Sequence, residues 1–317
     1  MQEKSKTKIL LTGVGGPAGI NMARLLKERD DVVVIGCDVD ETAAGQFFVD
    51  EFLIAPFVRN KEEYKEWMLV HAKEVDLVIP TVDEELKELA SFVSEIDAEV
   101  ALSPKETLEI AGNKLRAYKW MQDNLPEYAP QFISLADWTE GWSEVSELFI
   151  KPKFGRGARG CRVVSQTELS FLKKTEENTD DWIVMELLPG TEWTIDGYVA
   201  KNGKIVYLTP RERLGLAGGI SIKGRTVKNE AVQNAATALL QKLECRGPVC
   251  IQFKADTDGN PKFIEINPRL SGGLMITAAA GVDPVSAIFA DMNNEEQKSQ
   301  EWNEVTVVGH FEYKTLR

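Results

Sequence analysis

Residues 263–269 carry a carboxylate, an amide and a guanidinium at alternate positions, namely Glu265, Asn267 and Arg269. A period of two is that of one face of a β-strand, so the two intervening isoleucines are expected to point to the opposite face, toward a core. The run 249–255 before this segment is also strand-like, and Asp258-Gly259 favours a two-residue hairpin turn between them. Carboxylate and amide oxygens beside an arginine suit a hard cation next to phosphate, although an ordinary half-polar hairpin has the same pattern.

The predicted turn fixes the register of this hairpin. It places Gln252 directly opposite Glu265 on one face, and Cys250 opposite Asn267. An oxygen-rich cluster is then gathered from two strands.

Composition limits the classes of function. The 317 residues carry a net charge of −13, which argues against nonspecific binding to nucleic acid. An anionic ligand therefore needs a local basic cluster. The acidic run 83–85 is expected to be a solvated helix start. With only two histidines, Ser-His-Asp triads and multi-histidine metal sites are disfavoured.

Cysteine usage and hydropathy bear on the compartment. The four cysteines form no C-x-x-C motif, which predicts reduced, mostly buried thiols in a cytoplasmic protein: Cys37, Cys161, Cys245 and Cys250. The polar start of the chain does not resemble a signal peptide, and no apolar window is long enough for a membrane span.

The first hundred residues alternate strands with helices. Strands are predicted at 8–13, 32–37, 75–80 and 99–102, which favours a small parallel α/β unit. The glycine turn 13–19, with Asp38 after the second strand, suggests a dinucleotide site, but Ala18 occupies the third fingerprint position. The alternative is a loop that only packs closely on a neighbour.

A second glycine run follows the strand 148–153, which carries two lysines. Residues 155–160 read G-x-G-x-x-G between two strands, a context that favours a flexible hairpin over a triphosphate more than a Rossmann turn. Arg156 and Arg159 add positive charge to it. A mobile basic surface loop is the alternative.

Strands and helices continue to the end of the chain. We expect helices at 111–121, 167–174 and 229–243, strands at 182–186, 192–199 and 205–208, a loop at 215–219, an Ala-rich helix after 273 and a last strand at 305–311. Arg211 and Arg213 are candidates for binding a substrate carboxylate, or are surface arginines on a connection.

The motifs together resemble the ATP-grasp superfamily, and in particular single units similar to a carbamoyl-phosphate synthase half or to the pyrrolysine-pathway ligase. The resemblance rests on the order of Asn113-Lys114, Ile150-Lys151-Pro152, the run 155–160, the segment 185–192, Gln252 and the segment 265–269. It implies an α/β chain with a Rossmann-like pre-ATP-grasp domain at 1–104. Two α+β subdomains that sandwich ATP follow, a central one at 105–187 with a glycine-rich lid and a C-terminal one at 188–317 with the Mg/phosphate site.

The resemblance also implies roles for residues. Lys114 and Lys151 match the family lysines on the ATP phosphates, and Arg269 matches the arginine that stabilises an acyl-phosphate. Other positions match the lid, the adenine hinge and the acidic residue on the ribose: Gly155, Arg156, Gly157 and Gly160; Met185, Glu186, Leu187 and Leu188; and Glu192. Gln252, Glu265 and Asn267 match the ligands of two Mg²⁺ ions, for which Mn²⁺ could substitute. Gln252 stands where many ligases have an acid, which is expected to weaken one site.

The implied activity is an ATP-dependent carboxylate–amine ligase that releases ADP and phosphate. Lys151, Arg211 and Arg269 are its catalytic candidates. A carboxylate needs no strong base to attack the γ-phosphate, which agrees with the scarcity of histidine. The expected partners are small-molecule carboxylate and amine substrates, neither nucleic acid nor membrane, and a homodimer is compatible with them. A synthase-like phosphorylating subunit, a non-enzymatic nucleotide-binding protein and an NAD-dependent enzyme remain alternatives.

Overall fold

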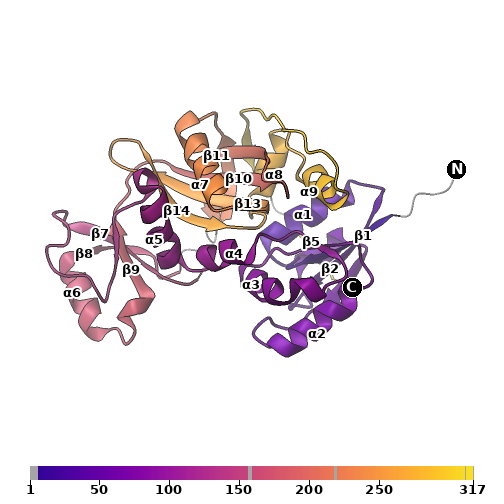
Figure 1. Cartoon of the computed structure of the whole chain (residues 1–317), viewed down its shortest axis with the longest axis horizontal. Helices are drawn as coiled ribbons and strands as arrows, with labels where there is room; N and C mark the ends of the chain where they lie inside the picture. The colour runs from indigo at the N-terminus through magenta and orange to yellow at the C-terminus, as the bar shows by residue number, and fades with distance from the viewer. Residues whose placement is uncertain (1–5, 156–158, 218–219, 311, 317) are drawn as a thin grey trace.

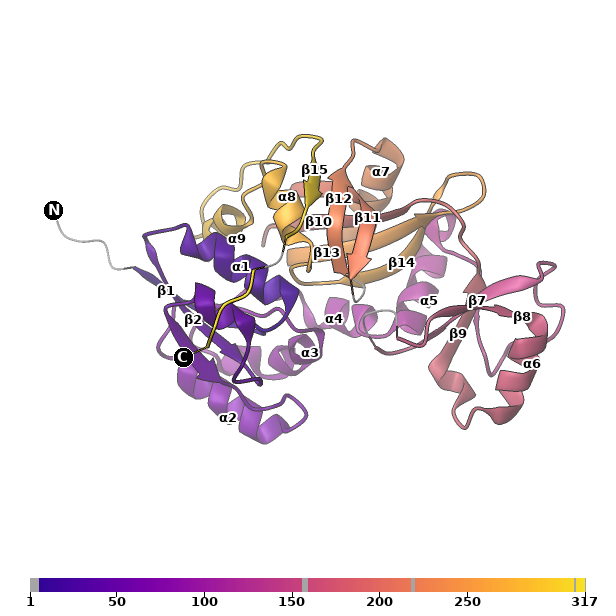
Figure 2. The same cartoon turned by 180° about the vertical axis from the view of Figure 1, so that it is seen from behind.

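Three β-sheets follow one another along the chain, as the computed structural model shows for residues 6–155, 159–217, 220–310 and 312–316. The first sheet and a small four-stranded sheet lie at opposite ends of the molecule, with a six-stranded sheet between them (Figures 1 and 2). This is the mixed α/β class that the sequence predicts. In the described parts of the chain, no helix combines the length and the apolar character needed to cross a membrane.

The first sheet is parallel, with strand order β3-β2-β1-β4-β5. Its strands are β1 (Thr7–Thr12), β2 (Val32–Asp38), β3 (Glu51–Ile54), β4 (Leu77–Ile79) and β5 (Glu99–Val100), and its helices are α1 (Pro17–Lys27), α2 (Lys61–Ala72) and α3 (Asp83–Phe92). The sequence patterns missed β3 and α2, because β3 is short and α2 buries only a narrow row of residues one turn apart, Tyr64, Met68 and Ala72. The strand order reverses between β1 and β4, so a crevice is expected outside their carboxyl ends.

The acidic run starts α3 as predicted, but it is only partly solvated, because Glu84 is exposed, Asp83 is half-buried and Glu85 is buried. Glu85 is only 3% exposed and accepts hydrogen bonds from Thr81 N at 3.0 Å and Tyr64 Oη at 3.0 Å, as well as from the Thr12 hydroxyl. Burial raises the pKa of Glu85, although these hydrogen bonds oppose the shift. The carboxyl group ties the start of α3 to the ends of β1 and β4.

The glycine turn after β1 makes its contacts with neighbouring parts of the protein. Gly15 N donates to Asp38 Oδ2 at 2.7 Å, so the acid that a dinucleotide site would direct at a ribose is held by the turn. A Cβ on Gly19 would lie 2.3 Å from Gly13 O, which explains the glycine there by close packing.

The four-stranded sheet is antiparallel, with order β6-β9-β7-β8. Its strands are β6 (Phe132–Ser134), β7 (Glu147–Pro152), β8 (Arg162–Ser165) and β9 (Trp182–Glu186). Helices α4 (Lys105–Ala111) and α5 (Lys114–Asn124) precede the sheet, and α6 (Gln166–Thr175) follows β8. Asn113 caps α5 and Ser165 caps α6, each by accepting a backbone N–H three residues on.

The six-stranded sheet is antiparallel, with order β14-β13-β10-β11-β12-β15. Its elements and the helices that pack beside it are β10 (Glu192–Val199), β11 (Ile205–Ala217), β12 (Ile220–Thr226), β13 (Gly247–Ala255), β14 (Pro261–Asn267), β15 (Thr306–Val308), α7 (Glu230–Lys242), α8 (Leu274–Ala279) and α9 (Pro284–Met292). The loop predicted at 215–219 is wrong for residues 215–217, because β11 continues through them and pairs with β12; residues 218 and 219 lie outside the described residues.

Hydrophobic clusters join the three regions. One cluster combines Leu11 and Met22 of the first region with Leu274 and Ile288 of the last. A second joins α5 and α7 to the six-stranded sheet. The division into domains at 104 and 187 therefore stays a prediction.

The C-terminal residues return to the first region. In Figure 2 they run across it toward β2, and the Lys314 ammonium lies 4.9 Å from the ring centre of Phe48.

Candidate functional site

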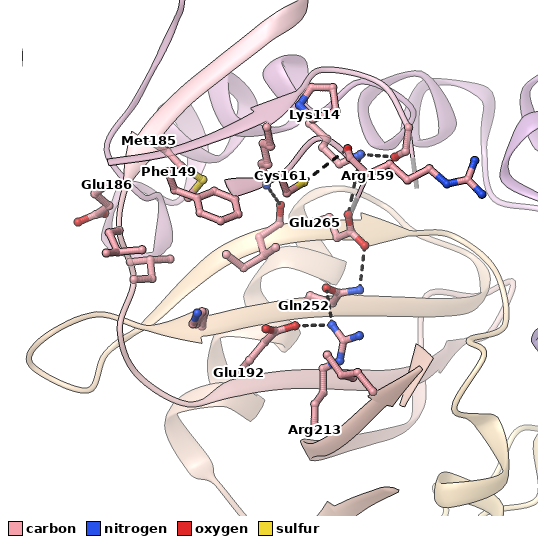
Figure 3. Close-up of a pocket in the computed structure, with 18 residues that line it drawn as sticks. Lys114, Phe149, Arg159, Cys161, Met185, Glu186, Glu192, Arg213, Gln252 and Glu265 are labelled. Carbon is pink, nitrogen blue, oxygen red and sulfur yellow. Dashed lines mark hydrogen bonds and ion pairs between the residues drawn. The ribbon is translucent and has the colours of Figure 1, made fainter. Parts of the chain in front are cut away.

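A cavity of ≈ 240 Å³ lies between the four-stranded and six-stranded sheets. Phe149, Met185 and Glu186 border one end of it, and Lys114, Cys161 and Glu265 border the other (Figure 3). Its lining includes five lysine and arginine side chains but only three glutamates: Lys114, Lys151, Arg159, Arg213 and Lys254 against Glu186, Glu192 and Glu265. This is the local basic cluster that an anionic ligand needs on a chain of net charge −13.

Helix α5 presents Lys114 to this cavity. Asn113 caps the helix, and Lys114 N donates to Lys153 O at 3.2 Å, which fixes the start of the helix against the end of β7. Lys114 Nζ donates to Gly155 O at 2.7 Å and lies 3.9 Å from Glu265 Oε2. Its charge therefore lies between the glycine run and the hairpin.

Lys151 reaches the cavity from β7. Its side chain is buried, its Nζ donates to the Tyr118 hydroxyl and to Ile264 O, the latter at 3.2 Å, and the residue is 4% exposed. Burial, with a smaller contribution from Lys114, lowers the pKa of Lys151 to about 8, although Glu265 opposes the shift. Burying an ammonium is costly, so a site that does so is a candidate for function.

The β13–β14 hairpin carries the predicted metal ligands. Gln252 pairs with Glu265 and Cys250 with Asn267, which confirms the predicted register. Gln252 Nε2 donates to Glu265 Oε1 at 2.8 Å, and Asn267 Nδ2 donates to the same oxygen at 3.2 Å. The donor set is one carboxylate and two carboxamides, whose oxygens suit Mg²⁺ when phosphate oxygens complete its shell.

The turn of this hairpin differs from the predicted one. The ladder near the turn pairs Ala255 with Pro261 and Phe253 with Phe263, and it shifts by one residue before Gln252. The shift leaves Ile264 as a bulge residue without a partner across the ladder. Ile264 lines the cavity and only partly packs against the core, whereas Ile266 is buried as predicted.

A polar chain continues along the cavity wall beyond Glu265. Arg213 Nη1 donates to Glu192 Oε1 and lies 3.4 Å from Gln252 Oε1. Figure 3 shows this row running from Lys114 through Glu265 and Gln252 to Arg213 and Glu192. Arg213 therefore lies on the wall of this cavity.

The segment 185–188 forms the apolar end with Phe149. Glu186 N donates to Gln131 O at 3.0 Å, and Glu186 Oε1 accepts from Gln131 N at 2.9 Å, so the side chain of Glu186 braces its own strand. Within the described residues, the amide of Leu188 donates no hydrogen bond. Leu188 itself lines this end of the cavity.

Twelve of the predicted residues line the cavity: Lys114, Lys151, Gly155, Arg159, Met185, Glu186, Leu187, Leu188, Glu192, Arg213, Gln252 and Glu265. Asn267 lies beside it through its bond to Glu265. Gly160 has φ +76° and packs near Trp182, while Arg156 and Gly157 lie outside the described residues.

The two arginines predicted to be catalytic, Arg211 and Arg269, are not among the residues that line the cavity. Arg211 is 2% exposed, so it is not a surface arginine, and it donates to Asp196 Oδ2 at 3.1 Å, Ser221 Oγ at 3.0 Å and Ser271 Oγ at 3.2 Å. Arg269 is paired with Asp83. Their roles stay predictions.

Sequence reasoning missed three residues here. Phe149 and Lys254 lie two positions from Lys151 and Gln252 on the same strands, so strand alternation would have placed them on the cavity face. Tyr118 lies four residues after Lys114, on the same helix face.

A parallel α/β unit followed by two antiparallel sheets that enclose a lysine-lined cavity is the architecture of the ATP-grasp class. Two family models agree with it. Residues 178–313 match "ATP-grasp in the biosynthetic pathway with Ter operon", and residues 9–102 match the PylC-like N-terminal domain. Residues 178–313 therefore match an ATP-grasp family model, and the chain as a whole resembles the ATP-grasp superfamily. Among curated proteins, no sequence matches significantly.

Solved structures share the fold at low sequence identity. N5-carboxyaminoimidazole synthetase from Staphylococcus aureus matches with a TM-score of 0.75 at 15% identity, over 93% of this chain and 79% of that one. The biotin carboxylase domain of Hydrogenobacter thermophilus 2-oxoglutarate carboxylase, solved with MgADP, ADP and bicarbonate, gives 0.73 at 17%, over 95% and 72%. L-amino acid ligase from Bacillus licheniformis gives 0.67 at 14%, over 92% and 75%.

Proposed function

We propose that the chain is an ATP- and Mg²⁺-dependent ligase that phosphorylates a carboxylate and passes the acyl group to an amine. The observation that carries this proposal is the polarity of one cavity, apolar at Phe149 and Met185 and basic at Lys114 and Lys151. A nucleoside triphosphate has the matching polarity, with a flat base at one end and anionic phosphates at the other. The match of residues 178–313 to an ATP-grasp family model supports the same ligand.

The base of ATP fits the apolar end. Phe149, Met185 and Leu187 offer contact area, and the unpaired amide of Leu188 offers a hydrogen bond to the edge of adenine. Glu192 lies between this end and the metal hairpin, where ribose hydroxyls would lie. Its contact with Arg213 keeps the carboxylate oriented.

Phosphates fit the basic end, where Lys114 and Lys151 flank Glu265. Gly155 brings backbone close to this end, and the rest of the glycine run is proposed as the lid. Glu265, Gln252 and Asn267 would hold Mg²⁺, which supplies charge neutralisation for the transferring phosphoryl group. Two ions, or Mn²⁺ in their place, remain part of this proposal.

The proposed chemistry has two steps. A carboxylate oxygen attacks the γ-phosphorus, the bond to the β-phosphate oxygen breaks, and ADP leaves an acyl-phosphate. An amine nitrogen then attacks the acyl carbon, phosphate leaves with the C–O bond electrons, and the amine loses a proton. Lysines and a metal suffice for the first step, because phosphoryl transfer depends on positioning and charge. Arg269 and Arg211 are proposed for the acyl-phosphate and the substrate carboxylate.

ADP release tests this function. The protein is incubated with Mg-ATP and paired panels of carboxylates and amines, and ADP is measured by a coupled assay. We expect one carboxylate class to stimulate release and an amine to stimulate it further. If ATP binds and no pair stimulates release, the ligase proposal fails in favour of a nucleotide-binding protein.

Nucleotide binding can be measured independently of ADP release through the reactivity of Cys161. This thiol lines the cavity, whereas Cys37, Cys245 and Cys250 are buried. Mg-ATP should protect Cys161 from a maleimide, measured by peptide mass, and AMP should protect it less. Equal labelling with and without Mg-ATP would contradict the assignment of the cavity.

A further inference from the structure

Lys151 is held by two acceptors that come from different parts of the fold. One is the hydroxyl of Tyr118 on α5, and the other is the carbonyl of Ile264 on β14, at 3.2 Å. Tyr118 Oη itself donates to the same carbonyl at 2.7 Å. The three groups form a closed triangle behind the cavity.

The hairpin bulge makes this triangle possible. Because Ile264 has no partner across the β13–β14 ladder, its carbonyl is free to accept from side chains. Tyr118 is held in turn by its ring, which packs edge-on against Phe263 at 5.7 Å and lies 5.3 Å from Phe132. The hydroxyl therefore has a fixed position in a buried environment.

Resting on the proposed function, we infer that Tyr118 is a positioning residue, whose hydroxyl and the Ile264 carbonyl hold the Lys151 ammonium in place for ATP phosphate. An ammonium has three N–H donors. Tyr118 and Ile264 take two of them, and the third is left for a ligand in the cavity that Lys151 lines. The Tyr118 ring adds a cation–π contact, with Nζ 4.7 Å from its centre.

Charge around Lys151 explains why such a support matters. The charged and titratable groups that act on it are Lys114 and Tyr118 on α5, Cys161 before β8, Glu192 on β10 and Glu265 on β14. Burial lowers the pKa of Lys151 to about 8, with Lys114 adding to the shift and Glu265 opposing it. Burial raises the pKa of the Tyr118 phenol well above its usual range, so the phenol stays neutral and accepts a hydrogen bond.

Removing the hydroxyl should therefore shift the pH dependence of nucleotide binding. Phosphate prefers protonated Lys151, so wild-type affinity should fall as pH rises through about 8. In Tyr118→Phe the ammonium loses an acceptor, which favours the neutral amine. The fall should begin about one pH unit lower, as expected for loss of a hydrogen bond to a charged group, so that affinity is about fivefold weaker at pH 8 and about tenfold weaker at pH 9.

The experiment measures the affinity for the Mg²⁺ complex of the non-hydrolysable ATP analogue AMP-PNP by calorimetry from pH 6.5 to 9.5. Tyr128→Phe is the matched control, because Tyr128 packs on the same core through Phe253. Its curve should superimpose on that of the wild type. A Tyr118→Phe curve that superimposes on wild type, or is displaced equally at every pH, overturns the inference.

A double variant separates positioning from packing. In a Lys151→Gln background, Tyr118→Phe should change the affinity for Mg-AMP-PNP by less than about twofold, because the ammonium that the Tyr118 hydroxyl positions is absent. A loss as large as in the wild-type background overturns the inference. If circular dichroism shows that Tyr118→Phe alone does not fold, a folded Tyr118→Phe/Lys151→Gln double variant supports the inference. An unfolded double variant overturns it. Failure of the wild type to bind the analogue would instead refute the proposed function.

Discussion

The Arg269 guanidinium forms a bidentate ion pair with the Asp83 carboxylate, with both N–O distances 2.6 Å. Arg269 follows the β13–β14 hairpin, whereas Asp83 is the first residue of α3 in the parallel sheet region. Arg269 Nη1 also donates to Leu270 O at 2.8 Å. The guanidinium of the proposed acyl-phosphate arginine is therefore oriented by the first region of the chain.

Asp83→Asn should loosen this arginine. An amide cannot offer two anionic oxygens, so the free energy of unfolding should fall by about 1 kcal/mol, a value that allows for partial exposure of the pair. ATP turnover should fall more than nucleotide affinity does. Urea denaturation and ADP release measure the two effects. Glu95→Gln, at the exposed Lys65–Glu95 pair, is the control and should leave the urea midpoint unchanged; a loss of the same size there would contradict a special role for Asp83.

Lys151→Met should raise the stability of the fold but abolish nucleotide binding. The folded-state pKa of Lys151, about 8, is below its ordinary value of 10.5, so the unfolded chain binds this proton more tightly. Wild-type stability should therefore rise between pH 8 and 10.5, and the variant lacks this dependence. Below pH 8 the variant should be more stable by up to about 3 kcal/mol, while losing nucleotide binding.

Urea denaturation from pH 7 to 10.5 checks this prediction. The difference in unfolding free energy between Lys151→Met and wild type should shrink as pH rises. A difference that is constant across this range, or that grows with pH, would show that burial of the ammonium costs the fold nothing.

The hairpin shows how much of the site the sequence could predict. The assumed two-residue turn correctly paired Gln252 with Glu265, although the turn observed is longer. A bulge at Ile264 offsets the longer turn, so the register at the site is the predicted one. The longer turn and the bulge compensate each other, so neither changes which residues pair at the site. The sequence pattern therefore gave no indication of the Ile264 carbonyl.

The two arginines on β11 show where sequence reasoning stops. Arg211 and Arg213 lie on the same face of one strand, but only Arg213 lines the cavity. Arg211 is covered by a segment sixty residues later: a Cβ on Gly273 would lie 2.5 Å from its Nη2. Which half of a sheet face is covered depends on long-range packing that periodicity does not encode. Burial of Glu85 escaped prediction for the same reason.

Gly19→Ala tests whether the N-terminal glycine turn serves packing. The added Cβ would lie 2.3 Å from Gly13 O and 2.8 Å from Val14 Cα, so backbone must move. We expect a loss of about 2 kcal/mol or more, within the range for overpacking. Gly16→Ala is the control, because its nearest atom lies at 3.4 Å and its φ is −87°. Equal thermal melting of the two variants would contradict close packing as the reason for Gly19.

Glu265→Gln should raise the Mg²⁺ requirement of nucleotide binding. Glu265 is the one carboxylate among the three predicted metal ligands, and both neighbouring amides donate to its Oε1. Among the residues the structure describes, no cluster of three His, Cys, Asp or Glu side chains could replace it. Because Mg²⁺ prefers anionic oxygen, the Mg²⁺ concentration at half-maximal AMP-PNP binding should rise about tenfold or more.

Asp258→Asn removes the same charge from the turn of this hairpin and should leave the titration unchanged. Mn²⁺ titration followed by electron paramagnetic resonance would count the ions, and an unaltered Mg²⁺ midpoint in Glu265→Gln would remove Glu265 from the proposed metal site.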